Sequence, residues 1–202
     1  MEKFYFELPT IERKEEALEY LKEHRDYNSD INGTGGMNKV NEEYSYEEWL
    51  DDVINSMDKD YVESKGLVPA TTYFTIRKSD NKIIGMVSLR HYLNDNLKRL
   101  GGHIGYGVRP TERRKGYNKI QLYLALLEAK KIGLDKVMLD CLETNIGSDK
   151  TIQALGGEFD GDVFIEERNQ TFKNYWINVD DSIEKYKDVY GKYILKDIKR
   201  KW

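Results

Sequence analysis

Cysteine is scarce in this chain, and long apolar runs are missing from it. Cys141 is the single cysteine among 202 residues, so no intramolecular disulfide can form, which is typical of proteins in a reducing cytosol. No apolar stretch approaches the roughly 18 residues that are needed to span a bilayer, and residues 1–5 are unlike a signal peptide. We therefore expect a cytoplasmic protein that has no disulfide framework and no membrane partner.

The chain also lacks an excess of positive charge. Its 32 Lys and Arg residues are outnumbered by 36 Asp and Glu residues, which gives a formal net charge of -4. A protein that binds nucleic acid through a uniformly basic surface is therefore not expected. The exception is local, because residues 109–116 hold four cations and one anion within an otherwise acidic chain.

Length and hydrophobic periodicity predict one domain that mixes helices and strands. A chain of 202 residues is a little longer than one average domain. Runs of β-branched and aromatic residues predict strands near 4–8, 71–76, 83–89, 103–108, 136–142, 159–166 and 172–179. Apolar residues at helical spacing predict helices near 9–25, 45–62, 117–131 and 146–155. The fold class is therefore α+β, or mixed α/β, with one domain over 1–179 and a helical, solvent-facing extension over 180–202.

Local patterns add connectivity to this outline. Ser45 and Glu48 have the spacing of a capping box, which predicts that a helix begins at residue 45. Residues 71–91 and 159–179 are each expected to form an antiparallel hairpin. Residues 103–142 form a strand, helix, strand pattern, so these two strands should run parallel with a right-handed crossover.

The basic segment lies between a predicted strand and a predicted helix. The N-terminus of a helix presents unpaired N–H groups and the positive end of the helix dipole, so it can bind an anion. Gly116 lets the backbone approach a bulky ligand, and Arg113, Arg114 and Lys115 add charge that suits phosphate. Neither the dinucleotide-binding fingerprint nor the P-loop motif is present. The segment therefore predicts a phosphate-binding turn, with a solvated cationic loop as the alternative.

The wider pattern around this turn resembles the GCN5-related N-acetyltransferase family. The resemblance is strongest over 101–157, where a strand, the basic turn, a helix, a strand, Asn-Ile-Gly-Ser at 145–148 and Gly-Gly at 156–157 follow one another. Residues 89–94 and 101–106 resemble a bacterial subgroup of predicted acetyltransferases. The resemblance implies an acyl-CoA N-acyltransferase-like fold, in which helices flank a central, mixed, mostly antiparallel sheet and two parallel strands splay apart at the coenzyme site. It also implies acetyl-CoA as co-substrate and no metal.

In that family an R/Q-x-x-G-x-G/A motif wraps the pyrophosphate of acetyl-CoA. Here the motif falls on residues 113–118, where Arg113 and Gly116 match and Asn118 replaces the usual small residue. Asn145 and Ser148 match a second family pattern that contacts the coenzyme, although Asn145 is also well placed to cap a helix. The resemblance thus implies a set of coenzyme contacts, made by Val108, Arg113, Arg114, Lys115, Gly116, Tyr117, Asn118, Asn145 and Ser148.

The candidate catalytic residues are His103, Glu143 and Cys141. His103 lies near the position where the family often carries a glutamate base, and the usual imidazole pKa of about 6.5 suits proton acceptance. A packed histidine is the alternative. Glu143 and Asp140 are reserve candidates at the end of the neighbouring strand.

The general acid is left open by the sequence. Many family members place a tyrosine seven residues after the Asn, and here Ile152 occupies that position. Cys141, Tyr106 and Tyr123 are nearby in the sequence and could supply a thiol or a phenol. For Cys141, a buried strand residue is the alternative.

These observations predict an acetyl-CoA-dependent N-acetyltransferase that moves acetyl directly to a primary amine in a ternary complex. The lone thiol has no base partner placed by a motif, so an acetyl-cysteine intermediate is not expected. The acceptor would be a small molecule or a peptide, cationic in keeping with the acidic chain, and a homodimer is compatible with the sequence. The family resemblance implies that the acceptor lies between the first two helices and the hairpin strands, with candidate walls at 33–36, Tyr44, Tyr46 and Trp49. The alternative is a non-catalytic acetyl-CoA-binding or sensing module that has lost the tyrosine acid.

Overall fold

The computed structural model describes residues 1–195, whose strands form two antiparallel sheets. The 4-stranded sheet has the order β1-β2-β3-β4, and the 3-stranded sheet has the order β5-β7-β6. The strands are β1 (Phe4–Glu7), β2 (Ala70–Arg77), β3 (Lys82–Arg90), β4 (Ile104–Val108), β5 (Lys136–Leu142), β6 (Glu158–Ile165) and β7 (Gln170–Asn178). Both predicted hairpins, β2-β3 and β6-β7, are confirmed.

The two sheets meet where β4 begins beside β5. The backbone N–H of His103 donates to the carbonyl of Met138 at 2.7 Å. Beyond this bond, no ladder joins β4 to β5 in the described part of the chain, because β4 pairs with β3 and β5 pairs with β7. The expected central sheet is therefore divided in two at this point, and a parallel ladder between the two strands is not formed.

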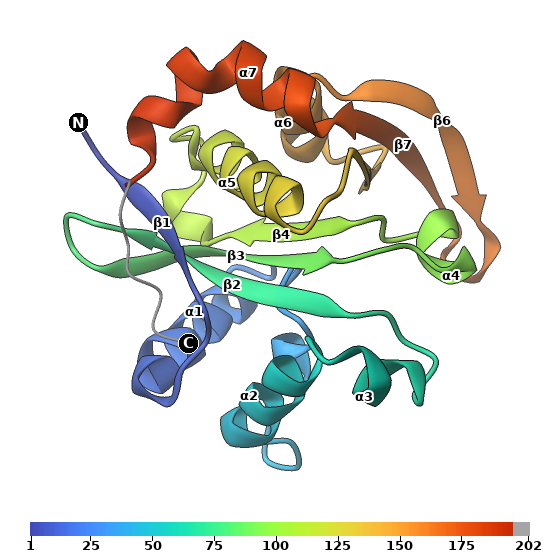
Figure 1. Cartoon of the computed structure of the whole chain (residues 1–202). Helices are drawn as coiled ribbons and strands as arrows, with labels where there is room; N and C mark the ends of the chain where they lie inside the picture. Colours follow the sequence, from blue (N-terminus) through green and yellow to red (C-terminus); the bar gives the residue numbers. More distant parts are fainter. Residues whose placement is uncertain (196–202) are drawn as a thin grey trace.

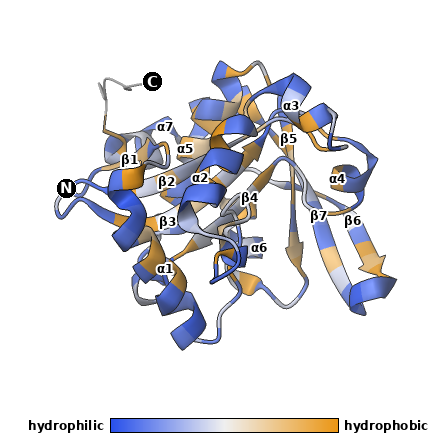
Figure 2. Cartoon of the chain, turned by 90° about the horizontal axis from the view of Figure 1, so that it is seen from below, coloured by the Kyte–Doolittle hydropathy of each residue, from blue (hydrophilic) through white to orange (hydrophobic). Residues whose placement is uncertain are grey.

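Helices cover both faces of the first sheet (Figure 1). One face carries α1 (Lys14–Asp26) and α2 (Tyr46–Asn55), and the other carries α5 (Tyr117–Lys131). On the side of α5, α6 (Ile146–Ala154) and α7 (Val179–Tyr190) pack against α5 and beside the second sheet. Side chains that alternate along β2 and β3 point into two separate hydrophobic cores, one against each helix layer. Figure 2 shows β5 as largely apolar, whereas α1 has apolar and polar segments side by side. The α+β class expected from the sequence is confirmed.

The predicted helix over 45–62 is two helices in the structure. Its start is as expected, since Ser45 caps α2 and forms the full capping box with Glu48. However, α2 ends at Asn55, and a second helix, α3 (Lys59–Glu63), begins where the Asp58 side chain accepts hydrogen bonds from backbone N–H groups. An N-cap residue inside the apolar pattern thus divides the helix. The short α4 (Asp95–Arg99) precedes β4.

The C-terminal helix α7 forms as expected, but it does not simply face solvent. Ile183, Tyr186 and Tyr190 pack against the core beside α5, and the buried Ser182 hydroxyl donates to the Leu155 carbonyl at 2.6 Å. The solvent-facing expectation is therefore wrong for one face of α7, whereas Glu184, Lys187 and Asp188 on its other face are exposed. The rest of the predicted extension, over 196–202, lies outside the described residues. Within residues 1–195, no helix has both the length and the apolar character needed to cross a membrane.

Candidate functional site

The basic segment forms the turn between β4 and α5. A short 3-10 turn over Pro110–Glu112 follows β4, and α5 begins after Gly116, whose φ is 81°. Arg114 has a φ of 63°, so the backbone is left-handed at two positions of this turn. No side chain caps the first turn of α5. The amides at this helix N-terminus are therefore available to an anion, as the sequence predicts.

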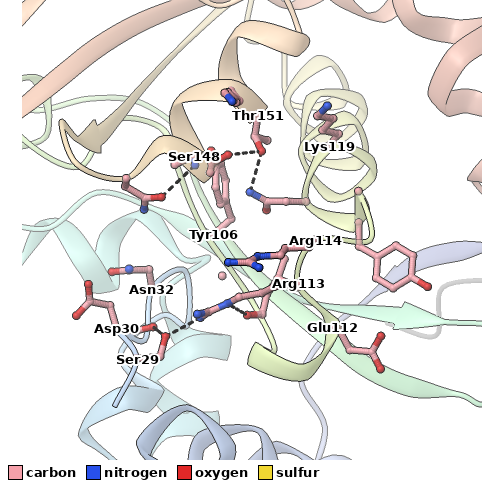
Figure 3. Close-up of a pocket in the computed structure, with 18 residues that line it drawn as sticks. Ser29, Asp30, Asn32, Tyr106, Glu112, Arg113, Arg114, Lys119, Ser148 and Thr151 are labelled. Atoms are coloured by element: carbon pink, nitrogen blue, oxygen red, sulfur yellow. Dashed lines mark hydrogen bonds between the residues drawn. The ribbon is translucent and has the colours of Figure 1, made fainter. Parts of the chain in front are cut away.

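A cavity of about 650 Å³ opens directly in front of this turn (Figure 3). A volume of this size falls in the range typical of small-molecule and cofactor sites. Its walls come from the loop after α1, from β4 and the basic turn, from the first turn of α5, and from α6. The lining residues are Ser29, Asp30, Asn32, Tyr106, Gly107, Val108, Glu112, Arg113, Arg114, Gly116, Tyr117, Asn118, Lys119, Asn145, Gly147, Ser148, Lys150 and Thr151.

Positive charge gathers at the turn end of the cavity. Arg113 is held in place because its Nε donates to the Val108 carbonyl at 3.1 Å and its Nη2 donates to Ser29 Oγ at 2.6 Å. Arg114 points into the same space (Figure 3). Lys119 and Lys150 add two cations from the helices α5 and α6. This end of the cavity suits a ligand with several phosphate groups.

The acidic Glu112 in this wall is already neutralised. Arg77 contacts its carboxylate at 2.7 Å and Lys115 contacts it at 2.8 Å. Burial raises the pKa of Glu112, but the hydrogen bonds from Arg77 and Lys115 outweigh this and hold it below its ordinary value. Lys115 is therefore directed to Glu112 and does not line the cavity, and its expected contact with a coenzyme stays a prediction.

The opposite wall of the cavity is polar and comes from α6. Asn145 caps this helix, since its Oδ1 accepts from the Ser148 N–H at 3.1 Å, and both residues line the cavity. The capping and the lining roles of Asn145 therefore occur together. Asn118 donates to Thr151 Oγ1 at 3.3 Å, so its side chain reaches across to α6. The Tyr106 hydroxyl, which projects from β4, lies 2.8 Å from Ser148 Oγ.

The structure brings together most of the predicted coenzyme residues. Apart from Lys115, every one of them lines the cavity: Val108, Arg113, Arg114, Gly116, Tyr117, Asn118, Asn145 and Ser148. Their contact with a coenzyme stays a prediction. The contiguity of the basic turn and the short spacing from Asn145 to Ser148 made these residues recognisable in the sequence.

His103 does not reach the cavity. Its side chain is 6% exposed, and its Nδ1 accepts a hydrogen bond from the Met138 N–H at 2.9 Å. Burial, together with the charge of Arg90, lowers the pKa of His103 to about 4. The nitrogen that would take a proton is thus occupied by the backbone, and the structure places His103 as a packed histidine outside the cavity instead of as a base inside it.

The other catalytic candidates also lie outside the cavity lining. Cys141 is buried in β5, and burial, with Asp149 and Asp140 nearby, raises the pKa of its thiol to about 11. Glu143 is exposed just after β5, where its N–H donates to the carbonyl of Thr171. Asp140 accepts from the backbone N–H of Gly101.

Some of the residues that were expected to line an acceptor groove belong to the hydrophobic core. Trp49 and Tyr46 are fully buried in the hydrophobic core between α1, α2 and the sheet, so neither is free to contact a substrate. The glycine-rich loop lies closer to the site, because Gly33 packs against β4: a Cβ on Gly33 would come within 2.4 Å of the Tyr106 Cα. Tyr44 donates to Asp52 at 2.7 Å on the outer side of α2.

Several lining residues had no signal in the sequence. Ser29, Asp30 and Asn32 belong to the loop after α1, which is distant in sequence from the basic turn. This loop reaches the site because β4 has glycine where the chains touch: a Cβ on Gly107 would lie 2.8 Å from the Asn32 carbonyl oxygen. Among residues 1–195, no group of three or more His, Cys, Asp or Glu side chains could hold a metal ion.

Comparison with known proteins gives one family and one fold. The profile of the family described as "Acetyltransferase (GNAT) family" matches residues 33–156. No curated protein matches the chain significantly by sequence. Among solved structures, ribosomal-protein-S5-alanine acetyltransferase from Vibrio fischeri is 18% identical, with a TM-score of 0.64, covering 90% of this chain and 96% of that one.

Two further solved structures show the same fold at similar distance. RimL, a ribosomal L7/L12 alpha-N-protein acetyltransferase in complex with coenzyme A, is 14% identical, with a TM-score of 0.63, covering 88% of this chain and 95% of that one. A chimera of spermidine N-acetyltransferase from Vibrio cholerae and hSSAT is 14% identical, with a TM-score of 0.58, covering 90% of this chain and 99% of that one.

Proposed function

The chain belongs to the acetyltransferase (GNAT) family, and from this premise we propose that it moves an acetyl group from acetyl-CoA to a primary amine by direct transfer in a ternary complex. The observation that carries the proposal is the cavity itself. Its cationic end, at Arg113 and Arg114, adjoins an uncapped helix N-terminus, and its other walls are β4 and α6.

The cavity supports coenzyme binding in two parts. The phosphates would be held by Arg113 and Arg114 and by the first amides of α5. The pantetheine arm would follow β4 away from the turn. Beyond His103, this strand has a partner strand on one side only, so its other edge can pair with the amides of the arm.

Direct transfer is favoured over a covalent intermediate by the state of the single thiol. A nucleophilic cysteine reacts as the thiolate, and the pKa of about 11 keeps Cys141 protonated near neutrality. The thiol is also buried outside the cavity lining. In the proposed reaction the amine nitrogen itself attacks the thioester carbon, so the acceptor must bind with its amine neutral.

The acceptor is proposed to be cationic. The net charge of -4 favours attraction of a positively charged molecule over long range. Two proteins of this fold point to acceptors of that kind by their names, since one is a ribosomal-protein-S5-alanine acetyltransferase and the other derives from spermidine N-acetyltransferases. A polyamine and a peptide N-terminus are therefore the two acceptor chemistries to compare.

Calorimetry with acetyl-CoA, followed by measurement of thiol release, tests the proposed function. In the thiol-release assay the protein is given acetyl-CoA and one of three amine acceptors. These are spermidine, a peptide that begins with alanine, and a lysine-containing peptide with a blocked N-terminus. Thiol release that requires one of these amines supports the transferase. Binding of acetyl-CoA without transfer to any of them supports the sensing alternative, and a folded protein that binds no acetyl-CoA contradicts both.

A further inference from the structure

The departing sulfur of the coenzyme requires a hydrogen-bond donor, and the expected one is absent. When an amine displaces the coenzyme, the carbon–sulfur bond breaks and leaves its electron pair on sulfur. Developing charge of this kind is stabilised by a donor that is fixed in place beforehand. Ile152, which stands seven residues after Asn145 on α6, is fully buried and has no proton to donate.

Most hydroxyl groups in the cavity wall are committed to other partners. Ser29 Oγ, at the phosphate end, donates to the Asp30 carbonyl at 3.3 Å and accepts from Arg113 at 2.6 Å. Thr151 Oγ1 donates to the Gly147 carbonyl at 2.8 Å within α6. The ring of Tyr117 packs against that of Phe4, with centroids 4.8 Å apart, and the Arg77 guanidinium lies 5.9 Å from its centre.

Tyr106 differs from these groups in both position and bonding. It lies on β4, two residues before Val108, so a ligand that binds its phosphates at the turn and runs back along β4 passes Val108 before it reaches Tyr106. Its hydroxyl contacts Ser148 Oγ at 2.8 Å, and either atom can be the donor in that bond. If Ser148 donates, the proton of Tyr106 is free to turn to a ligand.

We propose that the Tyr106 hydroxyl donates a hydrogen bond to the coenzyme sulfur as the thioester breaks, and that Ser148 is the positioning residue that holds this hydroxyl. The inference rests on the proposed function, since it assigns a role in the same transfer. Tyr106 would be a catalytic residue because it touches a reacting atom, whereas Ser148, besides its predicted contact with the coenzyme, would act on the sulfur only through Tyr106.

The step balances without any further reagent. The neutral amine forms a nitrogen–carbon bond to the thioester carbonyl, and collapse of the intermediate breaks the carbon–sulfur bond. The electron pair of that bond stays on sulfur, where the Tyr106 O–H stabilises it. The proton that the new amide nitrogen loses ends on sulfur through solvent, so the products are a neutral amide and the coenzyme thiol.

Burial keeps Tyr106 suited to this role over a wide pH range. Burial is the largest influence on its hydroxyl and raises the pKa of Tyr106 above its ordinary value, so the O–H remains intact wherever the enzyme would be assayed. A donor in a low-dielectric wall also interacts more strongly with a developing anion than the same donor in water. Tyr106 therefore stabilises the sulfur by donating a hydrogen bond, and it does not transfer its proton to the sulfur.

The first test is Tyr106→Phe, which removes one oxygen and keeps the ring. A hydrogen bond to a charged group is worth about 1.5–3 kcal/mol, so kcat with acetyl-CoA and the best amine of the panel should fall about 10- to 150-fold. The KM for acetyl-CoA should stay within about twofold. Tyr123→Phe is the matched control, because it removes a buried hydroxyl that donates to Ile183, outside the cavity, at 3.2 Å. Equal kcat values for Tyr106→Phe and the wild type would overturn the proposal.

The second test needs no amine acceptor. Calorimetry compares coenzyme A with its analogue that lacks the thiol, from pH 7 to pH 9.5, across the usual thiol pKa of about 8.5. If Tyr106 stabilises the bound thiolate, the affinity ratio of coenzyme A to the analogue rises with pH in the wild type. It should stay flat in Tyr106→Phe. A rise of equal size in both proteins would overturn the proposal.

Ser148 variants separate positioning from folding. Ser148→Ala should lower kcat about 3- to 10-fold and reduce the pH-dependent rise in affinity, whereas Ser148→Thr, which keeps a hydroxyl, should restore both. If Tyr106→Phe does not fold, as judged by its melting temperature, the two Ser148 variants still test the proposal. In that case, failure of Ser148→Thr to restore kcat would contradict the proposal. Failure of the wild type to transfer acetyl would refute the proposed function, whereas full activity of Tyr106→Phe refutes only this inference.

Discussion

At one end of the cavity, Arg113, Arg114 and Gly116 stand together in a single turn of chain; at the other end, Tyr106 and Ser148 meet across 42 residues of sequence. The turn binds charge with groups that follow one another, so its chemistry is contained in a short motif. The far end depends on β4 and α6 being packed side by side by the core. Changes at the turn should therefore affect coenzyme binding, and changes at the far end should affect turnover.

The largest effect is expected at the turn. Arg113→Glu removes a guanidinium that can make two charge-assisted hydrogen bonds and places an anion beside the phosphates, a loss of about 4 kcal/mol or roughly a thousandfold in the Kd of acetyl-CoA by calorimetry. Arg99→Glu is the control, because Arg99 is exposed on α4 and pairs with Glu167. An unchanged Kd in a folded Arg113→Glu protein would contradict the assignment of the turn.

His103 sharpens the comparison because it lies close to the far end in sequence without taking part in it. The pKa of His103 is about 4 in the folded protein, below its ordinary value of 6.5. Between pH 4 and pH 6.5 the ring is therefore protonated in the unfolded chain and neutral in the folded protein. The stability contributed by the neutral ring is present above pH 6.5. It is lost as the pH falls from 6.5 to 4, by up to about 3 kcal/mol.

His103→Asn keeps an acceptor for the Met138 N–H and removes the titration. Urea denaturation at several pH values should show a smaller loss of stability from pH 6.5 to 4 in the variant than in the wild type. The pH dependence of kcat between 6 and 8 should be unchanged. Loss of a pH limb that the wild type shows in that range, or a large fall in kcat at pH 7, would restore His103 as a candidate base.

The difference between the two ends also explains what could be predicted from the sequence. Arg113 and Gly116 were recognisable because a strand, a basic turn and a helix imply an anion site by local geometry alone. Position along the chain does not reveal which atom a side chain meets, so the sequence could not show that His103 lies outside the cavity with its Nδ1 accepting from the Met138 N–H. For the same reason, the sequence could not show that Lys115 pairs with Glu112 within the turn itself.

Tertiary packing supplies the rest of the site. Ser29 and Asn32 line the cavity because the loop after α1 lies against β4, and only the three-dimensional fold reveals that proximity. The predicted helix over 45–62 failed at Asp58, where a local cap outweighs a continuous apolar pattern. The strands and most helices were predictable because their periodicity reflects burial in one of two cores.

Gly107 lies on β4 between Tyr106 and the basic turn, where the loop after α1 packs against the strand. Gly107→Ala would place a methyl group 2.8 Å from the Asn32 carbonyl oxygen and 3.1 Å from the Tyr20 hydroxyl, so the loop after α1 must shift away from β4. We expect a loss of about 1–3 kcal/mol in the free energy of unfolding, together with weaker binding of acetyl-CoA. Gly147→Ala is the control for stability, because its added Cβ meets nothing closer than 3.6 Å. Equal stability of the two variants would mean that the loop does not depend on this close approach.

The smallest effect is expected at Lys115, and it tests whether charge or direction matters at the turn. If the turn bound phosphate through its total charge alone, Lys115→Ala would weaken acetyl-CoA binding about as much as Arg113→Ala. Because Lys115 is directed to Glu112 at 2.8 Å and does not line the cavity, we expect a change in Kd of less than about threefold. Glu112 keeps its contact with Arg77 in the variant, so the acidic wall stays neutralised. Calorimetry of the two alanine variants side by side checks this, and equal losses would show that the turn acts as a diffuse positive field instead of a set of directed donors.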